Sequence, residues 1–104
     1  IIFDDHSSLS SLGKYAFSRC ISLKNISIPS SLSIIDDYTF TECYSLEKIL
    51  IPSSILSLGD YAFNECCKLM NVQIPKSVIS IRATTFNHAR HWIKYQYSNL
   101  FYKY

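Results

Sequence analysis

Hydrophobic positions recur along this chain at a fixed interval of 23 residues. Within one copy, the alternation of Leu46, Ile49 and Ile51 has the period of a short strand with one buried face. The spacing of Ala62, Phe63 and Cys66 predicts one helical or 3₁₀ turn, and Ile55 with Leu58 predicts a second extended or irregular segment on the opposite side. The recurring columns include Phe17, Phe40, Phe63 and Phe86; Cys20, Cys43 and Cys66; Leu23, Leu46 and Leu69; and Ile28, Ile51 and Ile74.

One copy cannot bury its own apolar side chains, but copies stacked in register can, because like residues then lie on like. The sequence predicts a single α/β-type solenoid. We expect a short parallel sheet on its concave side and 3₁₀ turns, short helical turns or irregular segments on its convex side. The expected units are a partial repeat at 1–12, full repeats at 13–35, 36–58 and 59–81, and a degenerate capping repeat at 82–104. Because the chain begins within a unit, it is expected to be a fragment of a longer array.

Two other columns mark where the strands and turns should fall. Proline follows the strand in each full copy, at a strand end where its missing N–H costs no ladder bond. A turn column holds Gly13, Asp36, Gly59 and Arg82, and glycine and aspartate tolerate a positive φ there. Arg82 tolerates it poorly, which predicts that the last repeat is degenerate.

The unit reads Leu-x-x-Ile-x-Ile-Pro-x-Ser-Ile-x-x-Ile, then (Gly or Asp)-x-Tyr-(Ala or Thr)-Phe-x-x-Cys. Over about residues 5–86 it resembles the leucine-rich repeats of the BspA type, found in surface proteins of bacteria and parasitic protists. The resemblance implies a non-catalytic protein-interaction module, on the cell surface or secreted, that adheres to a host or extracellular-matrix protein. The alternative is an intracellular leucine-rich repeat scaffold, which the column of free cysteines favours.

The side chains that should point outward from the concave sheet form the predicted partner-binding site, because repeat proteins bind partners on such faces. The alternative is a solvated face with no specific partner. Asn25-Ile26-Ser27 also matches the acceptor pattern for N-glycosylation. The predicted site residues are Asn25, Ser27, Lys48, Leu50, Asn71 and Gln73.

The cysteine column is expected to lie in the core as free thiols. A zinc site of Cys66, Cys67, His88 and His91 is disfavoured, because zinc-binding cysteines are usually two to four residues apart. A metal site formed by residues 4–6 (Asp-Asp-His) is also disfavoured, because neighbours in a strand point to opposite faces. We therefore predict no metal and no cofactor.

Charge divides the chain, with a net of −4 over residues 1–65 and +6 over residues 66–104. The basic end could bind nucleic acid or sulfated glycans, but its scattered charges favour a solvated surface and no nucleic-acid partner. No serine has a histidine and an acid at a readable spacing, so no hydrolase triad and no enzyme is predicted. The sequence also lacks an apolar run of about 18 residues, so no membrane insertion is expected.

The aromatic tail keeps the register, so residues 92–97 predict one more strand whose large rings close the core. The alternative for the tail is an amphipathic helix.

Overall fold

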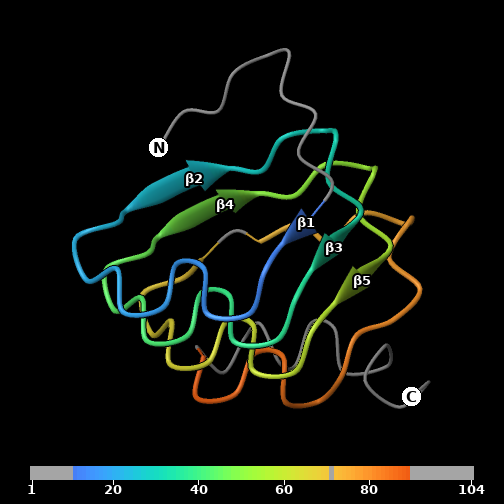
Figure 1. Ribbon diagram of the computed structural model, residues 1–104. Coiled ribbons are helices and arrows are strands. Elements are labelled where there is room, and N and C mark those ends of the chain that lie inside the picture. Colours follow the sequence, from blue (N-terminus) through green and yellow to red (C-terminus); the bar gives the residue numbers. More distant parts are fainter. Residues whose placement is uncertain (1–10, 71, 90–104) are drawn as a thin grey trace.

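The computed structural model describes residues 11–70 and 72–89 of the 104-residue chain. The described residues form five short strands, which join into two parallel sheets with the orders β1-β3-β5 and β2-β4. In Figure 1 the β2-β4 sheet lies at the upper left, and the β1-β3-β5 sheet lies to its right and lower. The strands are β1 (Ser11–Leu12), β2 (Asn25–Ser27), β3 (Ile34–Ile35), β4 (Lys48–Leu50) and β5 (Ser57–Leu58).

Neighbouring repeats pair without any shift in register. Ile26 pairs with Ile49 in the β2-β4 sheet, and Ile35 pairs with Leu58 in the β1-β3-β5 sheet. Each pair joins residues 23 positions apart, so the interval in the sequence is the interval between paired strands. The parallel sheet is therefore confirmed, and the second extended segment of each repeat forms a sheet of its own.

The β2-β4 sheet forms from the alternation of polar and apolar side chains. Both strands are exposed, buried and exposed in turn, and their central residues Ile26 and Ile49 are each 3% exposed. Pro29 and Pro52 stand two residues after the strand ends, where a residue without an N–H interrupts no ladder bond.

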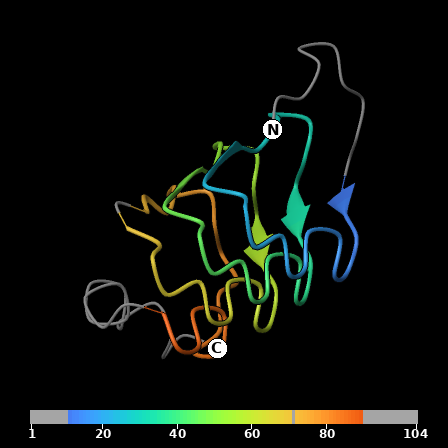
Figure 2. The ribbon, with the colours of Figure 1, turned by 90° about the vertical axis from the view of Figure 1, so that its left-hand side faces the viewer.

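The third side of each repeat is a run of tight turns, here called the turn layer, made of residues 13–20, 36–43, 59–66 and 82–89. Figure 2 shows these segments as a row of similar loops along the lower side. Backbone hydrogen bonds connect each loop to the next, as from Phe40 N to Ala62 O at 2.8 Å and from Phe63 N to Thr85 O at 2.9 Å.

The helical or 3₁₀ turn predicted around Phe63 is not formed in the described residues. Cys66 N does donate to Phe63 O at 3.2 Å, with the three-residue span of a 3₁₀ bond. However, Tyr61 and Glu65 have φ angles of 56° and 60°, and left-handed residues cannot continue a right-handed helix. The same two columns have positive φ in the other repeats, at Tyr15, Arg19, Tyr38, Glu42 and His88.

The positive φ expected in the column of Gly13, Asp36, Gly59 and Arg82 is wrong, because none of these residues has one. Gly59 is instead a place of close approach between repeats. A Cβ there would lie 2.5 Å from Asp37 Oδ1 and 2.6 Å from the carbonyl carbon of Asp36, and it would also press on Asp37 N. A Cβ at Gly13 would meet nothing within 4 Å.

The core lies between the two sheets and the turn layer. Phe40, Phe63 and Phe86 are fully buried and stack with centroid distances of 5.4 and 5.2 Å and interplanar angles of 4° and 9°. Phe17 extends the stack, 5.3 Å from Phe40. The predicted stacking of like residue on like residue is thus confirmed. Aliphatic columns complete the core, among them Leu32 and Ile55, Leu46 and Leu69, and Ile35, Leu58 and Ile81.

Several predictions fall outside the described residues. They concern residues 1–10 of the partial first repeat, with the candidate ligands at 4–6, and the strand or helix at 92–97. These stay predictions, as does the division of the chain into repeats. Within residues 11–70 and 72–89, no helix is long and apolar enough to cross a membrane.

Candidate functional site

The outward side of β2 and β4 is the face that the sequence predicts to bind a partner. Asn25 and Ser27 project from β2, and Lys48 and Leu50 project from β4. All four side chains are exposed, and Leu50 is 69% exposed. Their position follows from the two-residue period of a strand, which buries the central isoleucine and turns its neighbours outward.

Backbone hydrogen bonds hold this face in a fixed geometry. Ile28 N donates to Leu50 O at 3.0 Å, just beyond the paired strands. At the other end of the strands, Glu47 N donates to Lys24 O at 2.8 Å. The exposed side chains therefore stand on a backbone that is bonded at both ends of the sheet, so the backbone beneath them would lose little entropy on binding.

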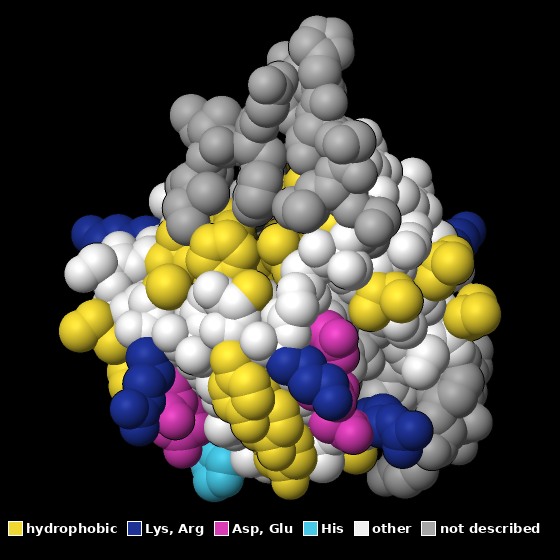
Figure 3. Space-filling view, viewed as in Figure 1, with side chains coloured by type: hydrophobic (Ala, Val, Ile, Leu, Met, Phe, Trp, Pro, Cys, Tyr) yellow, Lys and Arg dark blue, Asp and Glu magenta, His cyan; other side chains and the backbone are white. Residues whose placement is uncertain are grey.

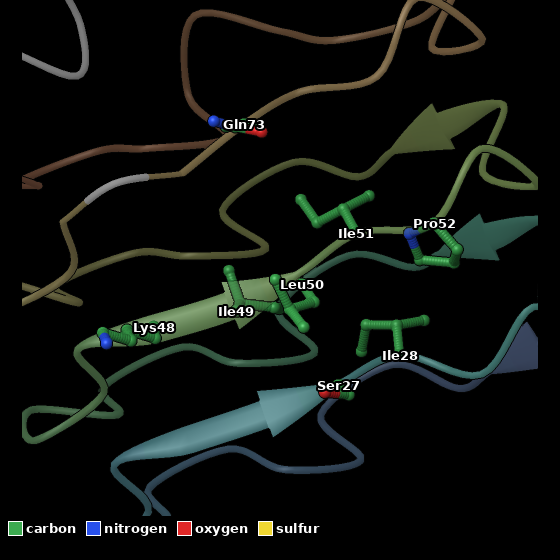
Figure 4. A pocket seen from close by; sticks show the side chains of 8 residues that line it. All are labelled: Ser27, Ile28, Lys48, Ile49, Leu50, Ile51, Pro52 and Gln73. Atoms are coloured by element: carbon green, nitrogen blue, oxygen red, sulfur yellow. The ribbon is translucent and has the colours of Figure 1, made fainter.

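A hollow of about 500 Å³ lies beside Leu50. Its apolar lining includes Ile28 and Ile49, which are buried, and Ile51, which is half-buried. Figure 4 shows Gln73 across the hollow from Leu50 and Ile51. The residues that line it are Ser27, Ile28, Lys48, Ile49, Leu50, Ile51, Pro52 and Gln73.

The hollow lies where the third repeat follows β4 without forming a strand of its own in its described residues. Met70 N still donates to Glu47 O at 3.0 Å, so the two repeats begin side by side. Residues 72–75, which the sequence aligns with Ile49–Pro52, form no strand. An apolar depression with polar groups at its margin can accept an apolar side chain and orient it by hydrogen bonds.

Five of the six predicted site residues are described and exposed, whereas Asn71 lies outside the described residues. Four of the five line the hollow, and Asn25 does not. Binding at this face stays a prediction, as does glycosylation of Asn25. The sequence reasoning missed Ile28, Ile51 and Pro52, although their recurrence at the strand end was a signal that could have found them.

The cysteine column lies inside the fold as predicted, with Cys43 and Cys66 buried and Cys20 half-buried, and all are free thiols. Cys43 Sγ donates to Phe17 O, and Cys66 Sγ donates to Phe40 O, each at 3.1 Å. The pKa of the Cys66 thiol is raised, chiefly by its contact with the Cys43 sulfur and secondly by its burial. These thiols therefore act as core side chains that also link neighbouring repeats.

The zinc alternative involves His91, which lies outside the described residues. Of the other candidates, Cys66 is buried and Cys67 is exposed. Within the described ranges, no three side chains of the metal-binding types lie together. Three of the basic residues of the C-terminal part are described, Lys68, Lys76 and Arg82, and they are exposed.

Comparison with known proteins identifies relatives of this fold. A leucine-rich repeat protein of T. pallidum has 30% sequence identity and a TM-score of 0.66, over 67% of this chain and 33% of that protein. A leucine-rich repeat protein of Bacteroides ovatus has 28% identity and a TM-score of 0.56, over 70% of this chain and 25% of that one. The chain thus spans a third or less of the length of these structures. No curated protein sequence matches it.

These likenesses, with the parallel strands, show a fold of the leucine-rich repeat type. Residues 2–102 match the family described as BspA type Leucine rich repeat region, in 6 copies. Such repeats are typical of surface or secreted bacterial proteins, are typically non-catalytic, and generally bind proteins. The resemblance seen in the sequence is therefore confirmed, and the chain belongs to the BspA-type leucine-rich repeat family.

Proposed function

We propose that this chain is a non-catalytic interaction module that binds a partner protein through the β2-β4 face. Leu50 is the observation that carries the proposal. A large aliphatic side chain that is 69% exposed on a bonded sheet, beside an apolar hollow, has the form of an interface anchor. Lys48 and Gln73 add polar groups that would orient the partner.

The proposed setting is the cell surface or the secreted fraction, and the proposed partner is an extracellular-matrix or host surface protein. The family supports this setting, because BspA-type repeats are typical of surface proteins. In this proposal the repeats continue as a solenoid, and the β2-β4 sheet lies on its concave side. Neighbouring repeats then widen the binding face.

The binding test compares the wild-type chain with the Lys48→Ala/Leu50→Ser double variant on immobilised matrix proteins, by surface plasmon resonance. We expect a loss of affinity of about tenfold or more, as for the truncation of an interface anchor. The matched control is Ile79→Ser, which changes an aliphatic residue that is 64% exposed away from this face. Equal affinities of the double variant and the wild type would exclude the β2-β4 face.

The second candidate is an intracellular scaffold, which the free cysteine column favours, because reducing compartments preserve thiols. Labelling intact source cells with a membrane-impermeant reagent separates the two settings. A labelled chain supports adhesion. An unlabelled chain recovered from the soluble fraction supports the scaffold.

A further inference from the structure

Three tyrosines stack on the outer surface of the turn layer, one from each of three successive repeats. Tyr15 and Tyr38 have ring centroids 4.9 Å apart, and Tyr38 and Tyr61 have them 5.2 Å apart, with interplanar angles of 11° in both pairs. Tyr15 is 56% exposed, and the other two rings are half-buried. We call these residues the tyrosine ladder.

Neither the backbone nor the core accounts for tyrosine at these positions. The φ angles of 62°, 59° and 56° favour glycine or asparagine, and a bulky residue is an outlier there. The rings lie outside the phenylalanine core, so burial in the core does not explain why tyrosine occupies these positions. In the fourth repeat the column holds Thr84, which has no positive φ. A partly exposed ring that recurs and stacks in three successive turns points to a function of that surface.

Acidic side chains flank the second and third tyrosines of the ladder along the chain, whereas Lys14 and Arg19 occupy the same places around Tyr15. Asp37 and Asp60 directly precede the second and third tyrosines, and Glu42 and Glu65 follow them by four residues. In Figure 3 a band of yellow side chains crosses the lower part of the surface, with magenta and dark blue side chains on either side. The turn layer carries five acids (Asp36, Asp37, Glu42, Asp60 and Glu65) and three bases (Lys14, Arg19 and Arg82).

The bases do not cancel this negative surface. Three exposed ion pairs connect neighbouring repeats, from Lys14 to Asp37 at 4.0 Å, from Arg19 to Glu42 at 3.4 Å and from Arg82 to Asp60 at 3.5 Å. Exposed pairs of this kind are weak and exchange readily with other cations. Among the described residues, Glu65 has no basic partner within 4.0 Å.

The ladder presents ring edges and hydroxyl groups, because the rings cover one another's faces. Sugars and nucleic-acid bases stack on open ring faces, and nucleic acid would also meet a net negative surface. No hydroxyl of the three tyrosines has a hydrogen-bond partner among the described residues. The pKa of Tyr38 is raised, first by burial and to a smaller extent by the neighbouring tyrosines and by Asp37 and Asp60. Its hydroxyl therefore stays protonated at neutral pH.

A guanidinium group has the complementary chemistry. It is planar and weakly hydrated, and its five N–H donors match carboxylate and hydroxyl oxygens. We propose that the tyrosine ladder with its flanking carboxylates is a second interaction surface, distinct from the β2-β4 face, that binds an extended arginine-rich segment of a partner protein. The tyrosines are already stacked, so binding would order few side chains.

The test measures binding of a fluorescent oligo-arginine peptide to the complete 104-residue chain by anisotropy at low salt. The chain has a net charge of +2, so overall charge does not attract this probe. Tyr38→Asn is the main variant, because asparagine removes the ring and tolerates the φ of 59°. We expect it to weaken binding about tenfold and Glu65→Gln to weaken it about threefold. Circular dichroism verifies that each variant folds.

The matched control is Lys48→Ala/Leu50→Ser, which alters the β2-β4 face and should leave peptide binding unchanged. Equal binding by wild type and Tyr38→Asn overturns the proposal. So does equal affinity for oligo-lysine and oligo-arginine, which would reduce the effect to charge alone. Because the double variant tests the other face, the failure of one proposal leaves the other standing.

Discussion

Alanine at the two glycines of the turn column should change stability in opposite directions. Gly13 and Gly59 occupy equivalent positions in the first and third full repeats, and neither has a positive φ. The usual penalty of alanine in a left-handed conformation is therefore missing at both. What differs is space, because a Cβ at Gly13 meets nothing within 4 Å, whereas a Cβ at Gly59 presses on the backbone of Asp36 and Asp37.

At Gly13 only the unfolded chain is affected. Alanine has fewer unfolded conformations to lose than glycine, so Gly13→Ala should stabilise the fold by about 0.4–1 kcal/mol. At Gly59 the same gain is offset by a steric clash with backbone atoms, which cannot rotate away as a flexible side chain could. Overpacking of this kind costs about 1–3 kcal/mol.

The clash at Gly59 also strains hydrogen bonds that hold the two repeats together. Gly59 N donates to Ile35 O at 2.8 Å, and Asp60 N donates to Asp37 Oδ1 at 2.7 Å. Lengthening one of them would cost about another 1 kcal/mol. We therefore expect Gly59→Ala to destabilise the fold by about 2–3 kcal/mol in total.

Urea unfolding followed by circular dichroism measures both changes, and an unchanged m-value shows that the same unfolding transition is compared. Asp37→Ala in the Gly59→Ala background is the internal control. It removes Asp37 Oδ1 but leaves Asp37 N and the Asp36 carbonyl carbon in place, so it should not restore stability. Stabilisation by both alanines, or a cost at Gly59 below about 0.5 kcal/mol, would refute the close approach of the two repeats.

Four further predictions test the core, the turns and the buried polar groups. Phe63→Ala should cost about 3–5 kcal/mol, because its ring is fully buried between two others, and urea unfolding measures this. Glu65→Gly should be more stable than Glu65→Ala by about 1 kcal/mol in thermal unfolding, because φ is 60° there. Ser54→Ala should stabilise the fold by about 1 kcal/mol, because the buried hydroxyl of Ser54 has no partner among the described residues. Ser77→Ala should instead cost about 1 kcal/mol, because Ser77 Oγ donates to Ile55 O at 2.7 Å, and urea unfolding curves of the two variants compare the effects. Stability should fall above about pH 8.5, because the raised pKa of Cys66 makes the unfolded thiol release its proton first; the contact with Cys66 lowers the pKa of Cys43, which opposes this fall but is the smaller shift, and urea midpoints at neutral and alkaline pH test this.

Each of these predictions has an outcome that contradicts it. A change below about 1 kcal/mol in Phe63→Ala would exclude the stacked core. Greater stability of Glu65→Ala than of Glu65→Gly would exclude the left-handed turn. Equal effects at Ser54 and Ser77 would show that both hydroxyls are solvated alike. A flat stability profile across the alkaline range would show that the raised pKa of Cys66 does not outweigh the lowered pKa of Cys43.

The strand register and the core could be predicted from the sequence, because burial imposes a strict choice of side chain. The columns of Phe63 and Ile49 hold apolar residues in each full repeat, because their side chains point into the core. The left-handed residues could not be predicted, because Tyr61 and Glu65 are poor residues for that conformation. Their φ angles are set by turns that bond each repeat to the next, as from Glu65 N to Asn87 O at 2.8 Å.

The candidate face was predictable in its exposed side chains but not in its shape. Lys48 and Leu50 face outward because a strand alternates. The hollow lies beside residues 72–75, which form no strand, although the sequence of that repeat still has the strand pattern, with Val72 and Ile74 in register. The tyrosine column was visible as a repeat, but its stacking became clear only in three dimensions.

The hydrogen bonds of the turn layer have a consequence for folding kinetics. They connect adjacent loops, as between Phe40 and Ala62, so a further repeat would add contacts of the same sequence separation. Relative contact order then falls as the array lengthens, and folding spreads from any formed pair of repeats at a rate nearly independent of length. Amide protons should exchange with solvent most slowly in residues 36–58 and in the turn at 59–66, which are bonded to a neighbouring repeat on both sides, and faster toward either end of the described residues.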